Sequence, residues 1–366
     1  MKIVTSREEL LKPLMMVGGV VEKRQTLPIL ANILINADKD KLKITATDLE
    51  VELKTQAQVQ EGGEIDFTLP ARKLIDICRA LPDDSKISID VSGEKAVIMA
   101  GRSRFTLGVL PAKDYPAIEV DGAVKAFKVQ ERVIKNLIEK TQFAMAQQDV
   151  RYYLNGLLLE MSDGVLKAVA TDGHRLALCE ETEGMDGFED FQILIPRKAV
   201  LELGRMLEDC DREIAIEVGT NNVRIMMGNT VFTSKLIDGK FPDYRKVIPE
   251  EADKHVVIKR DILKQALHRT SILSNEKYRG IRFNFDKDNL ELLAHNPEQE
   301  EAKEELEIDY SGEKLVIGFN VGYLIEVLST IDGENVVLEL KDENSSCLIK
   351  SEQSDKSRYV VMPMRI

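Results

Sequence analysis

The feature that most constrains this sequence is an internal repeat. The tripeptide Ala-Thr-Asp at 46–48 recurs 124 residues later at 170–172, and in the weaker form Ala-His-Asn after another 124 residues at 294–296. Self-similarity at a fixed period is typical of a chain built from repeated structural units. The 366 residues therefore predict three units of about 120 residues each.

A second landmark follows nearly the same period. An apolar helix is expected to open at Pro70, again at Pro196 and once more at Asn320. Charged, turn-forming sequence around 115–116 and 241–242 lies near the ends of the first two units. We therefore predict three domains, with boundaries at 1–122, 123–252 and 253–366.

Each unit contains the same order of helical and strand patterns. We expect a first helix at 6–20, 130–144 and 260–272, and a second helix at 71–80, 197–207 and 320–330. Between the helices, apolar and polar residues alternate with the two-residue period of half-buried strands. Several strands in succession, interrupted by single helices, indicate an α+β fold with antiparallel sheets and two helices in each domain.

Local signals support the helix boundaries. Ser6 and Glu9 form a capping-box pattern before the first helix, and Asn320 is a suitable cap for the last one. Pro13 lies inside the first helix and should kink or break it, because proline lacks the amide hydrogen that the helix needs.

The charge distribution leaves two interpretations open. The net charge is −13, which by itself argues against nucleic-acid binding. The six expected helices nevertheless carry more basic than acidic residues, so the rest of the chain is strongly acidic. A local basic surface can bind phosphates on a protein of acidic net charge. The alternative is that lysine and arginine are simply good helix formers on solvated faces.

Several classes of protein are disfavoured by composition. No apolar run reaches the ~18–20 residues of a membrane span, and the N-terminus has no secretory signal, so we expect a cytoplasmic protein without membrane contact. The cysteines at 78, 179, 210 and 347 are scattered, which suits a reducing compartment. The four histidines have no neighbours at ligand spacing, so we expect neither a metal site nor another cofactor.

Catalytic motifs are also missing. The sequence has no phosphate-binding glycine loop and no G-x-S-x-G nucleophile motif. Asp48 and Asp172 occupy equivalent repeat positions, but the third repeat has Asn296 there, so a turn-making role is the better interpretation. His174 could serve as a base, yet no nucleophile is recognisably placed for it. We therefore expect a protein that is not an enzyme.

Six ordered segments, at 149–156, 170–176, 240–245, 274–277, 296–301 and 359–366, closely resemble the bacterial DNA polymerase III beta-subunit family of replicative sliding clamps. The resemblance extends over the whole chain. It implies a ring-shaped homodimer of two head-to-tail chains with three similar domains each. In such a ring the helices line a hole for duplex DNA, and the sheets form the outside. The ring tethers the polymerase and performs no chemistry.

The resemblance also implies DNA contacts. The positions that match the family pattern are Arg24, Arg72, Gln148, Tyr152, Tyr153, Lys198 and Arg205. Phosphate contacts carry no sequence information, so they can hold DNA without fixing its register. The two tyrosines could stack on bases, although packing inside the protein is an equally good interpretation of that pair.

The family binds a short linear motif of its partners in an apolar cleft between the second and third domains. The partners implied are the DNA polymerase III alpha subunit, clamp-loader subunits and other proteins with a clamp-binding motif. The matching positions are Leu154, Thr171, Gly173, His174, Arg175, Leu176, Pro242, Arg245, Val247, Tyr278, Asn320, Tyr323, Ser346, Val360, Met362, Pro363, Met364 and Arg365. At the rim of this cleft, Lys246 and Asn344 depart from the family pattern.

The implied dimer contact joins the first domain of one chain to the third domain of the other. Phe105 and Leu107 should pack against Ile272 and Leu273. The charged residues expected around this apolar patch are Lys73, Arg102 and Arg104 on one side and Glu298, Glu301 and Glu304 on the other. Lys303 interrupts the acidic run.

Two other classes of function remain open at this point. One is a repair or processing enzyme that acts on DNA, which would need a metal-dependent activity. The other is a scaffold that binds partners without enclosing DNA.

Overall fold

The structure is a computed structural model that describes residues 2–21, 27–119, 122, 124–185, 187–249 and 252–365. The chain forms two compact units, which are described separately. The first unit comprises Met1–Arg132 and Leu201–Leu236, and the second comprises Val133–Val200 and Ile237–Ile366.

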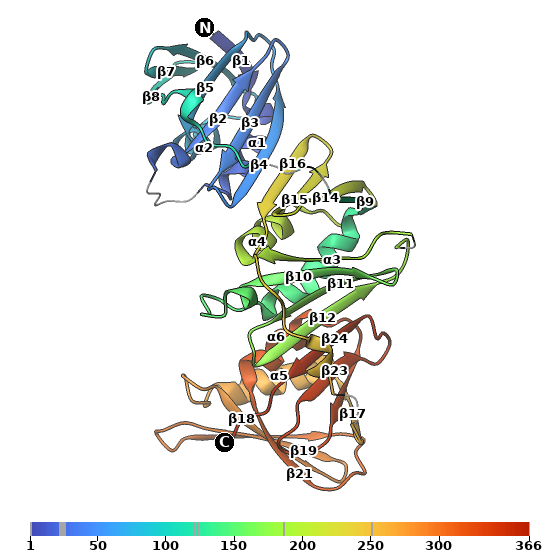
Figure 1. Cartoon of the computed structure of the whole chain (residues 1–366). Coiled ribbons are helices and arrows are strands. Elements are labelled where there is room, and N and C mark those ends of the chain that lie inside the picture. Colours follow the sequence, from blue (N-terminus) through green and yellow to red (C-terminus); the bar gives the residue numbers. More distant parts are fainter. Residues whose placement is uncertain are drawn as a thin grey trace. The chain divides into compact units, whose positions relative to one another are not determined.

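The first unit contains two antiparallel sheets (Figure 1). The larger sheet has eight strands, in the order β5 (Ile65–Pro70), β2 (Asn32–Ala37), β3 (Lys41–Thr47), β4 (Val51–Gln58), β16 (Thr230–Lys235), β15 (Asn222–Met227), β14 (Glu213–Val218) and β9 (Lys125–Gln130). The smaller sheet has four strands, in the order β1 (Lys2–Ser6), β6 (Lys86–Ser92), β7 (Lys95–Ala100) and β8 (Ser103–Gly108).

The second unit repeats this plan. Its eight-stranded sheet has the order β13 (Phe191–Pro196), β10 (Gly156–Ser162), β11 (Val165–Thr171), β12 (Arg175–Glu181), β24 (Ser357–Val361), β23 (Cys347–Ser351), β22 (Asn335–Leu340) and β17 (Lys254–Lys259). Its four-stranded sheet has the order β20 (Glu301–Glu307), β19 (Asn289–His295), β18 (Gly280–Asp286) and β21 (Leu315–Asn320).

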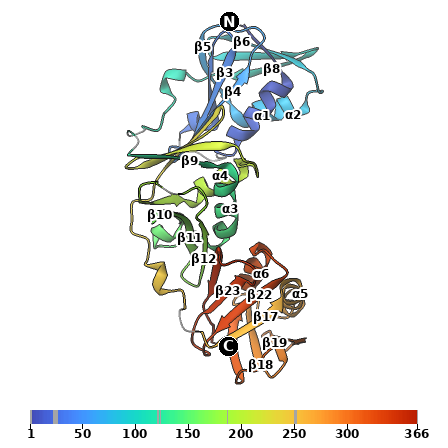
Figure 2. The ribbon, with the colours of Figure 1, turned by 90° about the vertical axis from the view of Figure 1, so that its right-hand side faces the viewer.

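The helices lie close to where the sequence places them. They are α1 (Arg7–Gly18), α2 (Ala71–Ala80), α3 (Glu131–Thr141), α4 (Arg197–Met206), α5 (Arg260–Ser271) and α6 (Val321–Thr330). The short 3-10 helices are η1 (Pro28–Ala31), η2 (Ala112–Asp114), η3 (Gln142–Ala144), η4 (Tyr152–Leu154) and η5 (Tyr244–Lys246). In the first unit α1 packs beside α2, and in the second unit α5 packs beside α6 (Figure 2). The predicted α+β class with antiparallel sheets is confirmed.

The predicted helix caps at Ser6 and Asn320 are present, and Pro13 lies inside α1. The Ser6 hydroxyl accepts a hydrogen bond from the Glu9 amide at 3.2 Å, and the Asn320 side chain accepts from the Gly322 amide at 2.9 Å. Of the kink or break predicted at Pro13, the break does not occur, because α1 continues through this residue as one helix. The ring of Pro13 is buried, and this packing offsets the hydrogen bond that proline cannot donate.

The repeated tripeptides form turns, as predicted. The Asp48 carboxylate accepts from the Val51 amide at 2.7 Å, and the Asp172 carboxylate accepts from the His174 amide at 2.9 Å. The Asn296 side chain accepts from the Glu300 amide at 2.9 Å. All three side chains therefore close the loop between the same two strands of their repeat.

Both large sheets are assembled from two repeats. In the first unit, β4 of the first repeat pairs with β16 of the second, and Leu53 stands opposite Phe232. In the second unit, β12 of the second repeat pairs with β24 of the third, and Ala177 stands opposite Tyr359. The same two strand positions are thus joined at both junctions between repeats.

The described part of the chain contains no helix that is long and apolar enough to cross a membrane. It also shows no group of three or more His, Cys, Asp or Glu side chains placed to hold a metal ion. The four cysteines are unbridged, and all but Cys210 are buried.

Candidate functional site

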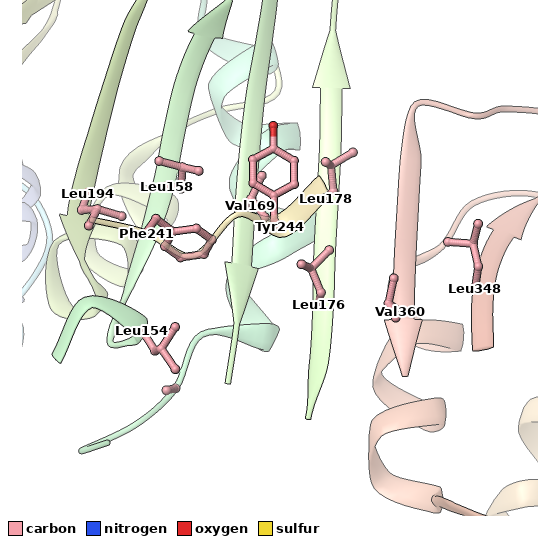
Figure 3. Packing of buried hydrophobic residues seen from close by; sticks show 11 residues of the cluster. Leu154, Leu158, Val169, Leu176, Leu178, Leu194, Phe241, Tyr244, Leu348 and Val360 are labelled. Carbon is pink, nitrogen blue, oxygen red and sulfur yellow. The ribbon is translucent and has the colours of Figure 1, made fainter. Parts of the chain in front are cut away.

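An apolar cluster in the second unit contains several residues of the predicted cleft. It combines side chains from β10 to β13 with Val360 of β24 and Leu348 of β23 (Figure 3). The predicted residues Leu154 and Leu176 belong to this cluster, and Val247 packs against it while remaining partly exposed. Figure 3 shows that strands of the second and third repeats supply the cluster together.

The turn between β11 and β12 forms one wall. The Thr171 hydroxyl donates to the Arg175 carbonyl at 2.6 Å, and the Gly173 amide donates back to this hydroxyl at 3.1 Å. Gly173 has a φ of +88°, a conformation that glycine adopts without strain. His174 is exposed, and its carbonyl accepts from the Met362 amide at 2.9 Å.

Arg175 is largely buried, with 9% of its surface exposed. Its guanidinium pairs with Asp172 at 3.1 Å and with Glu326 of α6, and it donates to the Phe143 carbonyl at 2.7 Å. It also lies 4.4 Å from the centre of the Tyr323 ring. These contacts occupy the guanidinium, so Arg175 fastens the second repeat to the third.

The segment after β16 forms a second wall of the predicted cleft. The Tyr244 hydroxyl donates to the Glu160 carboxylate at 2.6 Å, and burial together with this hydrogen bond raises the pKa of Tyr244. Arg245 pairs with the same carboxylate at 3.0 Å and lies over the Tyr244 ring at 4.7 Å. Glu160 thus anchors this wall to β10, and more than half of the Arg245 side chain is exposed.

Two cavities flank this wall. One, of about 590 Å³, is lined by Arg245, Val247 and Ser346 of the predicted set and by the rim residues Lys246 and Asn344. The other, of about 620 Å³, is lined by Tyr244 and shares Arg245, Ile248 and Pro249 with the first. The remaining residues of the second cavity are Lys167, Leu178, Glu180, Leu348, Lys350, Asp355 and Arg358.

Further residues of the predicted cleft lie in the C-terminal segment and on α6. The Met364 amide donates to the Gly318 carbonyl at 2.7 Å, which fixes the chain after β24 against β21. The Asn320 side chain donates to the Tyr278 carbonyl at 3.3 Å, and the Tyr278 ring is exposed. Met362 is also exposed. The remaining predicted residues are half-buried Tyr323 and Pro363 and exposed Pro242 and Arg365.

Sequence reasoning missed Arg151. Its guanidinium donates to the Asp172 carbonyl at 3.3 Å and pairs with Asp149 at 2.9 Å. A Cβ on Gly173 would lie 3.0 Å from that guanidinium, so Arg151 covers the turn directly. The Asp149 pKa is lowered to about 2, chiefly by the hydrogen bond from Arg151. The D-x-R spacing at 149–151 was the available signal.

The predicted DNA contacts lie in both units. In the first unit Arg72 and Arg205 are exposed, and Arg205 pairs with Glu202 at 2.7 Å. In the second unit Gln148 is exposed with a φ of +56° and Lys198 is half-buried. Arg24 lies outside the described residues.

The two tyrosines of the pair differ in exposure and packing. Tyr152 is 57% exposed, while Tyr153 packs against the apolar cluster of the cleft. The two rings meet edge to face, with centroids 5.8 Å apart. Tyr152 is therefore the better placed of the two to stack on a base.

The predicted dimer residues lie on two strands at sheet edges and at the end of one helix. Arg104, Phe105 and Leu107 are on β8, Arg102 comes just before the strand, and Lys73 is exposed on α2. Ile272 follows α5 and is 77% exposed, and half-buried Leu273 comes next. Exposed Glu298 lies in the turn before β20, exposed Glu301 begins that strand, and Glu304 pairs with Arg269 at 2.7 Å.

Comparisons with known proteins agree with this arrangement. The N-terminal, central and C-terminal domains of the DNA polymerase III beta subunit match residues 1–119, 128–243 and 245–365. The chain is 51% identical to a beta sliding clamp of Pseudomonas putida and 47% identical to one of Escherichia coli, in both cases over the full length of both chains. A crystal structure of the DNA polymerase sliding clamp of Pseudomonas aeruginosa has 50% identity, a TM-score of 0.96 and complete coverage of both chains.

The fold is therefore that of a three-domain clamp built from one repeated α+β unit. The chain belongs to the DNA polymerase III beta subunit family. The resemblance found in the sequence is confirmed.

Proposed function

We propose that this protein is a DNA sliding clamp, a ring of two chains that encloses duplex DNA and tethers the replicative polymerase without catalysing a reaction. Its place of action is the cytoplasm, where bacterial DNA is replicated. Each chain supplies three domains, and the boundaries 1–122, 123–252 and 253–366 are part of this proposal. The relatives that match over their full length are beta sliding clamps, which supports it.

One observation supports the assembly of two chains into a ring. The strand positions β4 and β16, and again β12 and β24, are joined at the two junctions within the chain. The third members of these two sets, β20 and β8, each pair on only one side among the described strands. Joining β20 of one copy to β8 of a second would repeat the same junction. A head-to-tail contact of this kind closes into a ring when its rotation allows.

The apolar part of the built junction has a counterpart at these edges. Phe143, after α3, packs against Tyr359 of β24 with ring centroids 5.9 Å apart. Ile272 follows α5 in the same way, and Phe105 is the aromatic residue of β8. The exposure of Ile272 supports a contact between Ile272 and Phe105 of a second copy.

The cleft supports binding of partner peptides. Its apolar cluster, exposed Met362 and the arginines at its edges suit short segments with apolar anchors and polar flanks. The DNA polymerase III alpha subunit, clamp-loader subunits and other proteins with a clamp-binding motif are the proposed partners. Lys246 and Asn344, which line the same cavity as Val247, are expected to adjust the preference among them.

Sequence-independent binding suits the proposed DNA contacts. Arg72, Lys198 and Arg205 would neutralise phosphates, and Gln148 would also touch the DNA, while Arg24, Tyr152 and Tyr153 would meet tilted duplex or the emerging single strand. None of these groups reads a base pair by itself, so DNA could move through the ring without a preferred register.

A topological experiment tests the function. The protein would be loaded on nicked circular DNA with its clamp loader and ATP, and half of the sample would then be linearised. We expect retention on the circle and release from the linear DNA, as measured by gel filtration. Blocking both ends of the linear DNA with bulky protein complexes is the control and should restore retention. Equal retention on circular and unblocked linear DNA would contradict enclosure.

A further inference from the structure

We propose that a cavity beside the cleft binds a carboxylate of the partner protein, so that this chain prefers partners with acidic residues next to their clamp-binding motif. This is the cavity of about 620 Å³ that Tyr244 lines, and we call it the basic cavity because its lining includes Lys167, Arg245, Lys350 and Arg358. The inference rests on the proposed function of the cleft as a site for partner peptides.

The charge of the basic cavity is opposite to that of the whole chain. Among the described residues that line it, four are cations, and only Glu180 and Asp355 are acids. The protein as a whole has a net charge of −13. A local field of this sign attracts anions. An acidic group of a partner is therefore the occupant whose charge complements the cavity.

Two of the four cations stand directly opposite one another on neighbouring strands. Lys350 of β23 is the register partner of Arg358 of β24. On their other sides, Lys350 stands opposite Val337 and Arg358 stands opposite Leu178. Like charges in this arrangement destabilise a sheet. Positions where a sequence breaks such a local rule are expected at functional sites, because function can require what stability disfavours.

One carboxylate is shared by two cations of the basic cavity. Glu180 pairs with Arg358 at 2.6 Å and with Lys167 at 3.7 Å. A guanidinium has five N–H donors, and within the described part of the chain Arg358 uses two of them, for Glu180 and for the Asp355 carbonyl at 3.4 Å. Further donors of Arg358 are therefore available to a carboxylate that enters the cavity.

The second cation of the pair has one buried and one exposed carboxylate beside it. Lys350 pairs with Glu339, whose side chain is 13% exposed, at 2.9 Å, and with Asp355, whose side chain is 77% exposed, at 3.3 Å. The hydrogen bond to Glu339 raises the pKa of Lys350, so the ammonium stays protonated at physiological pH. An exposed ion pair contributes little, so a partner carboxylate can replace Asp355 at small cost.

The basic cavity is continuous with the cleft. Leu178 and Leu348 belong to the apolar cluster of the cleft and also line the basic cavity (Figure 3). Three residues of the segment 244–249 are shared with the cavity of about 590 Å³ that Val247 and Ser346 line. A peptide whose apolar residues bind in the cleft therefore brings the residues beside its motif to the basic cavity.

The lining favours a peptide over a nucleic-acid strand. Binding of a strand depends on neutralising a row of phosphates. Here Glu180 and Asp355 lie among the cations and would repel such a row. Ile248, Pro249 and the two leucines also give the cavity an apolar part, which suits the side chains of a peptide.

Peptide binding tests the inference. Two fluorescent peptides would contain the clamp-binding motif of the DNA polymerase III alpha subunit, flanked on both sides by two glutamates in one and by two glutamines in the other. We expect the full-length protein to bind the glutamate peptide about fivefold more tightly in fluorescence anisotropy at low salt. High salt should remove this advantage, since it screens ion pairs.

The acidic net charge of the chain works against this result, so a preference for glutamate would have a local cause. Equal affinities, or tighter binding of the glutamine peptide, would overturn the inference while the proposed function of the cleft stands. Binding of neither peptide would contradict the proposed function, and the inference with it. Displacement of the glutamate peptide by a single-stranded oligonucleotide would assign the basic cavity to nucleic acid and overturn the inference as well.

A loss variant locates the effect. Lys350→Gln should remove most of the glutamate advantage and leave the affinity for the glutamine peptide unchanged, which also shows that the variant is folded. Lys287→Gln is the matched control, since this exposed lysine lies in the turn between β18 and β19 and its loss changes the net charge equally. A full glutamate advantage in Lys350→Gln would overturn the inference.

A gain variant excludes unfolding as the explanation. Asp355→Asn removes the exposed carboxylate that competes for Lys350, so it should strengthen binding of the glutamate peptide about twofold and leave the glutamine peptide unaffected. Glu313→Gln removes an exposed acid outside the basic cavity and should change neither affinity. Weaker binding of the glutamate peptide by Asp355→Asn would contradict a carboxylate site at Lys350.

Discussion

The two junctions between repeats share one strand pairing but differ completely beneath it. Beside β12 and β24, the Lys140 ammonium donates to the Thr330 carbonyl at the end of α6, and it pairs with Asp332 at 2.6 Å. Arg175 fastens the same helix through Glu326. Beside β4 and β16, a cavity of about 620 Å³ lies between α1 and α4 instead.

The repeat period shows which equivalent residues differ between the two junctions. We call the junction of β12 with β24 the fastened junction and the junction of β4 with β16 the open junction. For each residue of the fastened junction, the equivalent residue of the open junction lies 124 positions earlier in the sequence. Lys140 becomes Met16, Phe143 becomes Gly19, Arg175 becomes Val51, Glu326 becomes Glu202, Thr330 becomes Met206 and Asp332 becomes Glu208. All of these except Val51 line the cavity. The same fold therefore accommodates two kinds of junction. The fastened junction is held by the cations Lys140 and Arg175, and the open junction contains a cavity lined partly by methionines.

Glu202 of the open junction has partners other than the cations Lys140 and Arg175 of the fastened junction. Its carboxylate has lost the partner that Arg175 provides for Glu326, and it pairs with Arg205 of its own helix at 2.7 Å. It also rests on Gly19, where an added Cβ would lie 2.1 Å from its oxygen. Because Gly19 has no side chain, the Glu202 carboxylate, which has no counterpart of Arg175 beside it, fits against the backbone there.

The largest effect is expected from Arg175→Ala. Removing the guanidinium leaves Asp172 and Glu326 without their shared cation and should lower the free energy of unfolding by ~3 kcal/mol. Urea denaturation followed by circular dichroism measures this loss. Arg205→Ala removes the exposed cation of the other junction and should cost less than ~0.5 kcal/mol. Equal losses would show that the two junctions do not differ as described.

Lys140→Met copies Met16 into the fastened junction. It removes a charged donor from the Thr330 carbonyl, so we expect a loss of ~1.5–2 kcal/mol. The same denaturation series gives the value, and amide exchange should show faster opening at the end of α6. Lys135→Met is the control, since that side chain pairs with Glu139 of its own helix at 3.6 Å. Matching effects of the two substitutions would argue against a special role of Lys140.

Gly19→Ala tests the close approach at the open junction. The new methyl group must displace the end of the flexible Glu202 side chain, which should cost ~1 kcal/mol. Adding Glu202→Ala should recover most of this cost, because the two residues are in contact. Thermal unfolding of the two single variants and the double variant completes the cycle. Additive losses would mean that the carboxylate does not rest on Gly19.

Met16→Lys should have the smallest effect and the opposite sign. A lysine in the position of Lys140 would face Glu208, the counterpart of Asp332, and should stabilise the protein by ~0.5 kcal/mol. A rise in the thermal midpoint that disappears in 0.5 M salt would identify the ion pair as its cause. Met99→Lys, at an exposed position of β7 outside this cavity, serves as the comparison and should show no such rise.

The sequence was sufficient for the repeat and for the helices that it contains. Alternation and capping signals act within a few residues, so Ser6, Asp48 and Asn320 could be assigned from local chemistry. Pro13 was misjudged because the burial of its ring depends on distant residues. Arg151 was missed for the same reason, since its contact with the turn at Gly173 is created by the fold.

The joining of repeats inside one sheet could not be foreseen from local patterns either. Strand pairing between β12 and β24 connects residues that are almost half the chain apart, and alternation says only which face is buried. The apolar residues of the cleft were assigned through the resemblance, and the structure shows the packing that brings Leu154, Leu176 and Val360 together.

The composite sheets change what the peptide connection between two repeats contributes. Since β4 and β16 are joined by their own backbone hydrogen bonds, the connection that precedes β9 mainly keeps the two repeats at a high effective concentration. A chain nicked there would be expected to stay assembled, and to reassemble slowly once denatured. Covalent continuity would then govern the rate of assembly far more than the stability of the product.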